Sequence, residues 1–150
     1  MSVRYMLVDG HSVIFAWPDL RALHDRNRAA ARKALADQLQ HFHDTTPWLV
    51  TLILDGKMGT VVGTARKRTD MVISYATADQ TADSIIERMV GASGVASQIL
   101  VITADEAERL TVESMGAMTA SPAWLREEME REGESFSTYL DHVHRTARWK

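Results

Sequence analysis

The sequence contains no cysteine, and this absence excludes disulfide bonds, thiolate metal sites and cysteine nucleophiles. It also lacks any apolar run of about 18 residues, which excludes a membrane-spanning helix. A strand-like apolar segment begins almost at the N-terminus and leaves no room for a signal peptide before it. These absences predict a cytoplasmic protein that does not engage a membrane.

Several motifs that would indicate a known chemistry are also missing. Neither GxGxxG nor GxxxxGK[ST] is present, so nucleotide binding by those loops has no support. No GxSxG elbow supports a Ser-His-Asp triad, and the histidines show no HExxH or other metal-ligand spacing. The net charge of −3 and the pI near 6.0 do not favour bulk nucleic-acid binding. A polyanion would therefore need a local basic patch or bound metal ions.

The 150 residues, 45% of them hydrophobic, fit one domain with a sizeable core. No linker, repeat or low-complexity run divides the chain, so we expect a single domain over residues 1–150, with 133–150 as a C-terminal helical extension. Short apolar segments rich in branched residues predict buried strands. These segments are Arg4–Val8, Trp48–Leu54, Met71–Tyr75, Gln98–Thr103 and a very short one around Ala117–Met118.

The segments after these strands show helical spacing of apolar residues and helix-start signals, which predict helices. The predicted helices are Asn27–His43, Thr81–Ala92, Asp105–Met115, Ser121–Glu132 and Ser135–Arg148. The alternation of strands and helices predicts an α/β fold, a three-layer domain whose mainly parallel central sheet is flanked by helices.

Acidic residues recur near the ends of the predicted strands and at a helix start. Asp9 and Asp55 are each followed by glycine at a strand end, Asp105 follows another strand, and Asp83 opens a helix with Glu87 one turn later. Ligands of parallel sheets bind beyond the carboxyl ends of the strands, so these acids should meet there. Clustered carboxylates repel one another, and a divalent cation neutralises them.

Each acid also has a purely structural interpretation. Asp-Gly pairs are common in tight turns, which the chain would make at Gly10 and again at Gly56. Asp83 would be favoured by the helix dipole in a first turn, and Asp105 with Glu108 resembles a capping box. Capping and metal binding do not exclude each other, so both interpretations stay open.

A basic stretch follows the second predicted strand. Lys57, Arg66, Lys67 and Arg68 lie in the glycine-bearing segment after Asp55. Such a run is usually a solvated loop, but beside an acidic metal site it would hold substrate phosphates.

The motifs in this order resemble the YacP-like branch of the NYN-domain proteins, which belong to the PIN-like ribonucleases. The resemblance covers roughly residues 4–132 and is specific as a combination, although each piece alone is weak. The matching segments are Leu7–Gly10, Val13–Pro18, Thr81–Glu87, Val101–Asp105, Gly116-Ala117 and Ser121–Leu125.

The resemblance implies a PIN-like fold and a metal-dependent endoribonuclease that uses Mg²⁺ or Mn²⁺. Because some members act on messenger RNA at the ribosome, it also implies RNA, and with it the ribosome, as partners. Carried over by position, Asp9, Asp83 and Asp105 would be the catalytic carboxylates and metal ligands. Asp55 and Glu87 are additional ligand positions.

One motif departs from the family pattern. The family usually has Asp-Gly-Tyr-Asn, whereas His11 and Ser12 follow Asp9-Gly10 here. Ser12 could donate a hydrogen bond to a neighbouring carboxylate, and both residues are candidate substrate contacts. An RNA- or ribosome-binding adaptor without catalysis is therefore one alternative function. A small-molecule phosphatase is another alternative. The absence of a DxDxT-like motif after the first strand argues against it.

Overall fold

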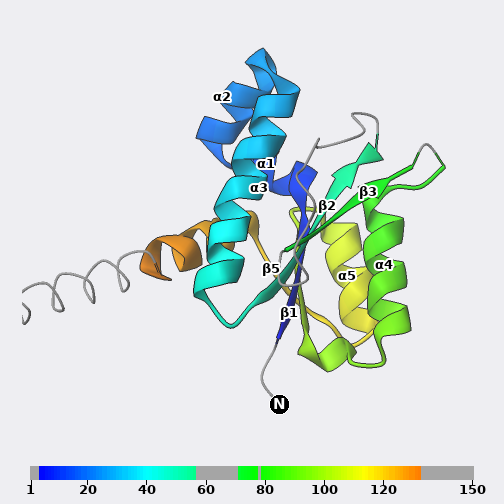
Figure 1. The fold of residues 1–150 in the computed structure, drawn as a ribbon. Helices are drawn as coiled ribbons and strands as arrows, with labels where there is room; N and C mark the ends of the chain where they lie inside the picture. Colours follow the sequence, from blue (N-terminus) through cyan, green and yellow to red (C-terminus); the bar gives the residue numbers. More distant parts are fainter. Residues whose placement is uncertain (1–3, 57–70, 78, 133–150) are drawn as a thin grey trace, which may run out of the picture.

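The computed structural model describes residues 4–56, 71–77 and 79–132, in which a five-stranded parallel sheet lies between two layers of helices (Figure 1). The strand order β3-β2-β1-β4-β5 places β1 at the centre of the sheet. The strands are β1 (Tyr5–Asp9), β2 (Leu49–Asp55), β3 (Val72–Ala76), β4 (Ile99–Ile102) and β5 (Met118–Ala120). The predicted parallel α/β architecture is confirmed, and each strand lies close to its predicted position.

Helices cover both faces of this sheet (Figure 1). One layer contains α1 (Gly10–Ala16), α2 (Pro18–Arg26), α3 (Arg28–Thr45) and a helix over residues 122–132. The other layer contains α4 (Ala82–Ser93) and α5 (Glu106–Ser114), and the short 3-10 helix η2 (Ala96–Gln98) precedes β4. The predicted helix Ser135–Arg148 and the extension 133–150 lie outside the described residues. Within those described, no helix is long and apolar enough to cross a membrane.

The segment between β1 and β2 corrects the sequence prediction. A sharp turn was expected at Gly10 and a single helix after it, but Asp9 caps α1, Gly10 is helical and α2 follows. Pro18 begins α2, as its fixed backbone angle favours. Trp17 joins the two helices, is 2% exposed, and its indole Nε1 donates a 2.9 Å hydrogen bond to the Pro122 carbonyl. This bond ties the junction of the two helices to a distant part of the chain.

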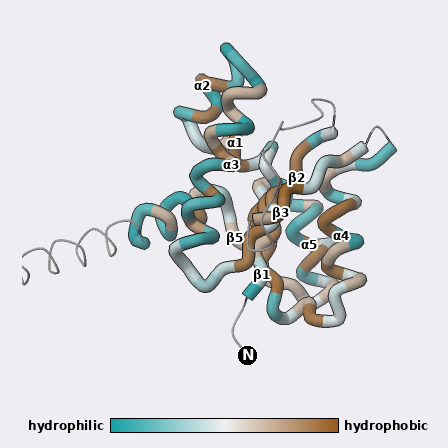
Figure 2. Tube along the Cα trace, viewed as in Figure 1, coloured by the Kyte–Doolittle hydropathy of each residue, from teal (hydrophilic) through white to brown (hydrophobic). Residues whose placement is uncertain are grey.

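The central strands β1, β2 and β4 are buried on both sides, and their residues alternate between two cores. Met6 and Val8 of β1 pack under α1–α3, whereas Leu7 faces α4 and α5. Strands β2 and β4 alternate in the same way, which explains their nearly continuous apolar sequences. Figure 2 shows the resulting concentration of hydrophobic residues along the central strands.

Gly10 is required by close packing rather than by a turn. A Cβ added there would lie 2.5 Å from Leu54 Cδ2 and 3.0 Å from the Ile53 carbonyl oxygen. We expect Gly10→Ala to lower the free energy of unfolding by about 1–3 kcal/mol, the usual cost of overpacking a core. Urea unfolding measures this change.

Gly91→Ala is the matched control. It lies inside α4, where an added Cβ would meet only the flexible end of Met115, at 3.2 Å. Since alanine restricts the unfolded chain and favours the helix, this variant should gain up to about 1 kcal/mol. Equal stability of the two variants would contradict the close packing at Gly10.

Candidate active site

An open cleft of about 550 Å³ lies at the carboxyl edge of the sheet. Its lining includes carboxylates from four separate segments: Asp9 at the end of β1, Asp55 at the end of β2, Asp83 in α4 and Asp105 just before α5. The chain runs from β1 to one side of the sheet through β2 and β3, and then to the other side through β4 and β5. The acids therefore meet at the switch point where α/β sheets bind ligands.

Asp9 is the most deeply placed of these acids, with 6% of its surface exposed. Its Oδ2 accepts a 2.7 Å hydrogen bond from the Ser12 hydroxyl and a 3.4 Å one from the Thr103 hydroxyl. Its Oδ1 accepts from the Ser12 amide at 3.4 Å, which makes Asp9 the N-cap of α1. Capping holds the carboxylate in one orientation at the base of the cleft, and the bond predicted from Ser12 is present.

The same hydroxyl groups join α1 to the loop after β4. Ser12 Oγ accepts a 3.1 Å hydrogen bond from the Ala104 amide, and Thr103 Oγ1 accepts one of 3.1 Å from the Asp105 amide. Thr103 is buried, and sequence reasoning did not select it as a site residue. Its place directly after an apolar strand and just before an acid was the available signal.

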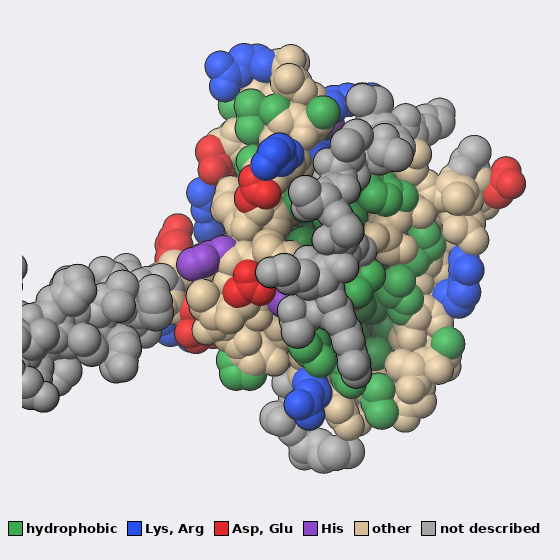
Figure 3. Space-filling view, in the orientation of Figure 1, with side chains coloured by type: hydrophobic (Ala, Val, Ile, Leu, Met, Phe, Trp, Pro, Cys, Tyr) green, Lys and Arg blue, Asp and Glu red, His purple; other side chains and the backbone are tan. Residues whose placement is uncertain are grey.

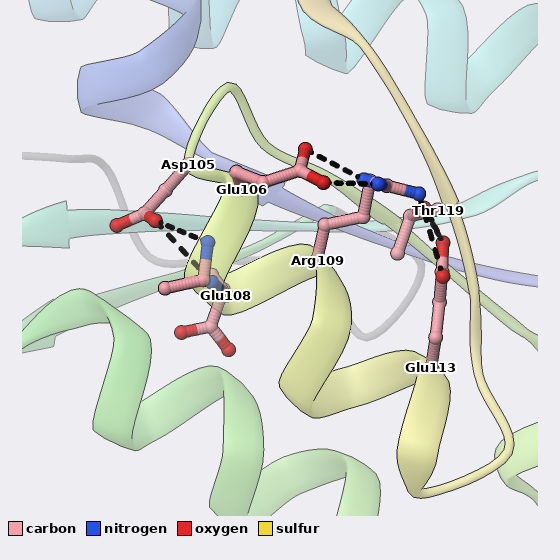
Figure 4. A network of polar contacts seen from close by, with 7 residues as sticks. Asp105, Glu106, Glu108, Arg109, Glu113 and Thr119 are labelled. Carbon is pink, nitrogen blue, oxygen red and sulfur yellow. Dashed lines mark hydrogen bonds and ion pairs between the residues drawn. The ribbon is translucent and has the colours of Figure 1, made fainter.

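Asp105 is the N-cap of α5, and its Oδ1 accepts from the amides of Ala107 at 2.9 Å and Glu108 at 3.3 Å (Figure 4). The capping interpretation is thus confirmed, but the capping box is wrong. The Glu108 side chain does not turn back to the cap; it points from α5 toward α4 (Figure 4). Glu106 pairs instead with Arg109 on another side of α5.

Glu108 is a buried carboxyl group that sequence reasoning did not include in the site. Only 3% of its surface is exposed, and its Oε1 finds no hydrogen-bond partner among the residues that the structure describes. Burial, followed by the charges of Asp83 and Glu87, raises the pKa of Glu108 to about 8. The local sequence could not show this, because the burial arises where α5 packs against α4.

The same cluster of carboxyl groups also shifts the pKa of Asp83, a predicted metal ligand. Burial raises the pKa of Asp83 above its ordinary value, and the negative charges of Asp9, Asp105 and Glu87 add to the effect. A side-chain interaction with Glu108 opposes this rise in the pKa of Asp83. Glu87 does not line the cleft but acts on Asp83 and Glu108 from beside it. This accumulation of like charge favours the arrival of a cation.

The donor set fits a hard divalent cation, since it consists of carboxylate oxygens. Across the described part of the chain, no three Asp, Glu or His side chains are arranged as a group that could hold a metal ion. Mg²⁺ usually keeps several waters and uses only one or two carboxylates, so it does not require three of them in direct contact.

Of the remaining predicted site residues, some line the cleft and others lie outside the described part of the chain. His11 and Ser12 line the cleft, and His11 Nδ1 lies 3.9 Å from Asp55 Oδ2. Asp55 is half exposed, and its carbonyl accepts a 2.8 Å hydrogen bond from Arg32 Nη1. The described Lys and Arg side chains are scattered over the face shown in Figure 3 rather than gathered in a patch. The predicted phosphate-binding residues Lys57, Arg66, Lys67 and Arg68 lie outside the described residues.

A parallel α/β domain with an acidic cleft at its switch point has the architecture of a PIN-like nuclease. The chain belongs to the YacP-like NYN domain family, whose model matches residues 6–150. It is 30% identical over 128 residues to the protein YacP of Bacillus subtilis (strain 168), described as uncharacterized, and the match covers 83% of this chain and 74% of that protein. The family resemblance noted in the sequence is thereby confirmed.

Crystal structures of Rae1 (YacP) from Bacillus subtilis have the same fold. A single-residue variant of Rae1 superimposes with a TM-score of 0.78 at 26% identity, over 93% of this chain and 82% of the variant. A second Rae1 structure gives a TM-score of 0.80 at 24% identity, over 96% of this chain and 83% of Rae1, and supports the fold alone.

Proposed function

We propose that this protein is a metal-dependent endoribonuclease that hydrolyses phosphodiester bonds in RNA. The observation that carries the proposal is the meeting of Asp9, Asp55, Asp83 and Asp105 at one cleft in a chain of the NYN family. The cleft is open, which suits a polymer that must be cut internally.

The carboxylates would hold the cation and position the RNA around it. Asp9, Asp83 and Asp105 are the proposed ligands for Mg²⁺ or Mn²⁺, and Asp55 and Glu87 would orient its waters. A bound ion of this kind activates the attacking water and stabilises the charge that develops on the phosphate. Hydrogen bonds from Ser12 and Thr103 fix Asp9, so this ligand needs no rearrangement when the ion arrives.

Positive charge must come from outside the cleft, because the acids repel an RNA phosphate. Lys57, Arg66, Lys67 and Arg68 follow β2 in the sequence and are proposed to hold substrate phosphates. His11 and Ser12, at the cleft, are the proposed local contacts to substrate.

Incubation of end-labelled RNA with the protein, in Mn²⁺, in Mg²⁺ or in chelator, tests this function. We expect internal cleavage with either ion and none with chelator. A parallel reaction on ribosome-bound messenger RNA tests the ribosome as a partner. Binding of RNA without cleavage in any condition would establish the adaptor instead. Hydrolysis of p-nitrophenyl phosphate without RNA cleavage would establish the phosphatase.

Metal binding should also appear as increased stability. An ion that binds only the folded state adds about 2.7 kcal/mol at a concentration of 100 times its Kd. We expect saturating Mn²⁺ to raise the Tm by several degrees, since about 1 kcal/mol shifts a domain of this size by roughly 2–4 °C. Asp9→Asn should reduce the rise, as differential scanning fluorimetry can measure.

Asp37→Asn is the control for this measurement. Asp37 is an exposed residue of α3 that pairs with Lys33 and does not line the acidic cleft. This variant should retain the full Mn²⁺ effect. An equal Mn²⁺ effect in Asp9→Asn and Asp37→Asn would contradict the role of Asp9 as a ligand.

A further inference from the structure

A cluster of rings extends from the lining of the cleft on α1 to the neighbouring helix α2. The His11 and Phe15 rings, one turn apart on α1, have centroids 4.4 Å apart and are tilted by 38°. The Phe15 ring in turn meets His24 of α2 edge-on, at a centroid distance of 4.8 Å. The Arg21 guanidinium lies 5.8 Å from the centre of the Phe15 ring. Four side chains from two helices thus form one cluster around the Phe15 ring.

Phe15 attaches this cluster to the hydrophobic core, and His11 is exposed to solvent. Phe15 is partly buried and packs against the core, so its position is fixed by the fold. The His11 side chain is 61% exposed, yet it rests on Phe15 and lies beside Asp55. His11 and Phe15 line the same cleft as the acids. Core packing explains why Phe15 is partly buried. It does not explain why the exposed His11 ring is held in place at the rim of an acidic cleft.

We propose that the His11–Phe15 stack is a platform for one unpaired base of a single-stranded RNA, next to the phosphate that is cut. This inference rests on the proposed endoribonuclease function. A nucleotide joins a charged phosphate to a flat ring, and the cleft offers acids for a bridging cation beside a rim of flat rings. Proteins bind unpaired bases by stacking them on aromatic and histidine side chains, with arginine beside them.

The platform defines the class of substrate that the cleft accepts. A base inside a duplex already stacks on its neighbours and cannot also lie on His11, so single strands, loops and unpaired ends should be preferred. Every base has a flat face, so stacking alone discriminates little between bases. The preference should therefore follow RNA structure more than RNA sequence.

A scan with abasic RNA tests the platform. Single abasic positions are moved along a single-stranded oligonucleotide, and Kd is measured by fluorescence anisotropy in the Asp83→Asn background to keep the RNA intact. We expect one position at which loss of the base weakens binding by about fivefold or more, the lower end of the effect of one stacking contact. His11→Ala should weaken binding of the complete RNA by a similar factor and abolish the dependence on that position.

Two variants make the result specific. His11→Phe keeps a flat ring and should retain the position dependence, which separates stacking from the charge of histidine. His41→Ala removes another exposed histidine, on α3 and outside the acidic cleft, and should behave as the parent. A flat abasic profile with normal RNA cleavage, or equal affinity for duplex and single strand, overturns the platform and leaves the nuclease proposal standing. RNA that neither binds nor is cleaved overturns both.

Discussion

Asp83→Asn is expected to reduce RNA cleavage by about a hundredfold or more, while RNA binding stays equal or becomes tighter. Even partners that only orient a metal ligand are worth about 10–100-fold in activity, and Asp83 is a proposed ligand itself. The same substitution removes one negative charge from a crowded acidic cleft, so an incoming phosphate meets less repulsion. Cleavage rates and equilibrium binding should therefore move in opposite directions.

Measurement of both quantities on one labelled RNA checks this expectation. Neutralising Arg66, Lys67 and Arg68 together should give the reverse pattern, with weaker binding that depends less on salt because fewer counterions are released. Asp37→Asn, which removes an exposed carboxylate outside the cleft, should leave both quantities unchanged. If Asp83→Asn cleaves as fast as the wild type, Asp83 is not part of the catalytic site.

The second large effect concerns the stability of the metal-free protein as a function of pH. The pKa of Glu108 is about 8 in the folded state against an ordinary value of 4.5, so between these pH values the folded state binds a proton that the unfolded chain has released. The free energy of unfolding should therefore fall as pH rises through this window, by at most about 1.4 kcal/mol per pH unit and by a few kcal/mol in all. The raised pKa of Asp83 contributes in the same direction.

Urea unfolding in chelator, from about pH 5 to about pH 9, measures this slope. Glu108→Gln keeps the size of the side chain and cannot ionise, so we expect a shallower slope and greater stability at the alkaline end. Glu113→Gln, on the same helix but more exposed, should keep the slope of the wild type. Parallel curves for Glu108→Gln and the wild type would show that Glu108 ionises as an ordinary carboxyl group.

The sequence was sufficient for the sheet and for the acids at its edge because both depend on local patterns. Buried parallel strands such as β2 are continuous apolar runs, and Asp9 and Asp55 end such runs. The parallel topology then brings acids from distant segments together without further information.

The features that were missed are two short helices and one buried acid. Helices α1 and α2 are short, and the indole of Trp17 between them bonds to the carbonyl of Pro122. Glu108 looked like the partner of a helix cap, and only the packing of α5 on α4 turns it into a buried acid beside Asp83. The cap at Asp9 and the proline that begins α2 were local signals for the helices, whereas no local signal reveals the burial of Glu108.

The hydroxyl of Ser12 bears on how this chain tolerates its departure from the family motif. That single group donates to Asp9 and accepts from the Ala104 amide. The side-chain amide of asparagine, which the family usually has at this position, also combines a donor and an acceptor. Serine thus supplies the same pairing of donor and acceptor, and the departure from the motif leaves Asp9 linked to the loop after β4.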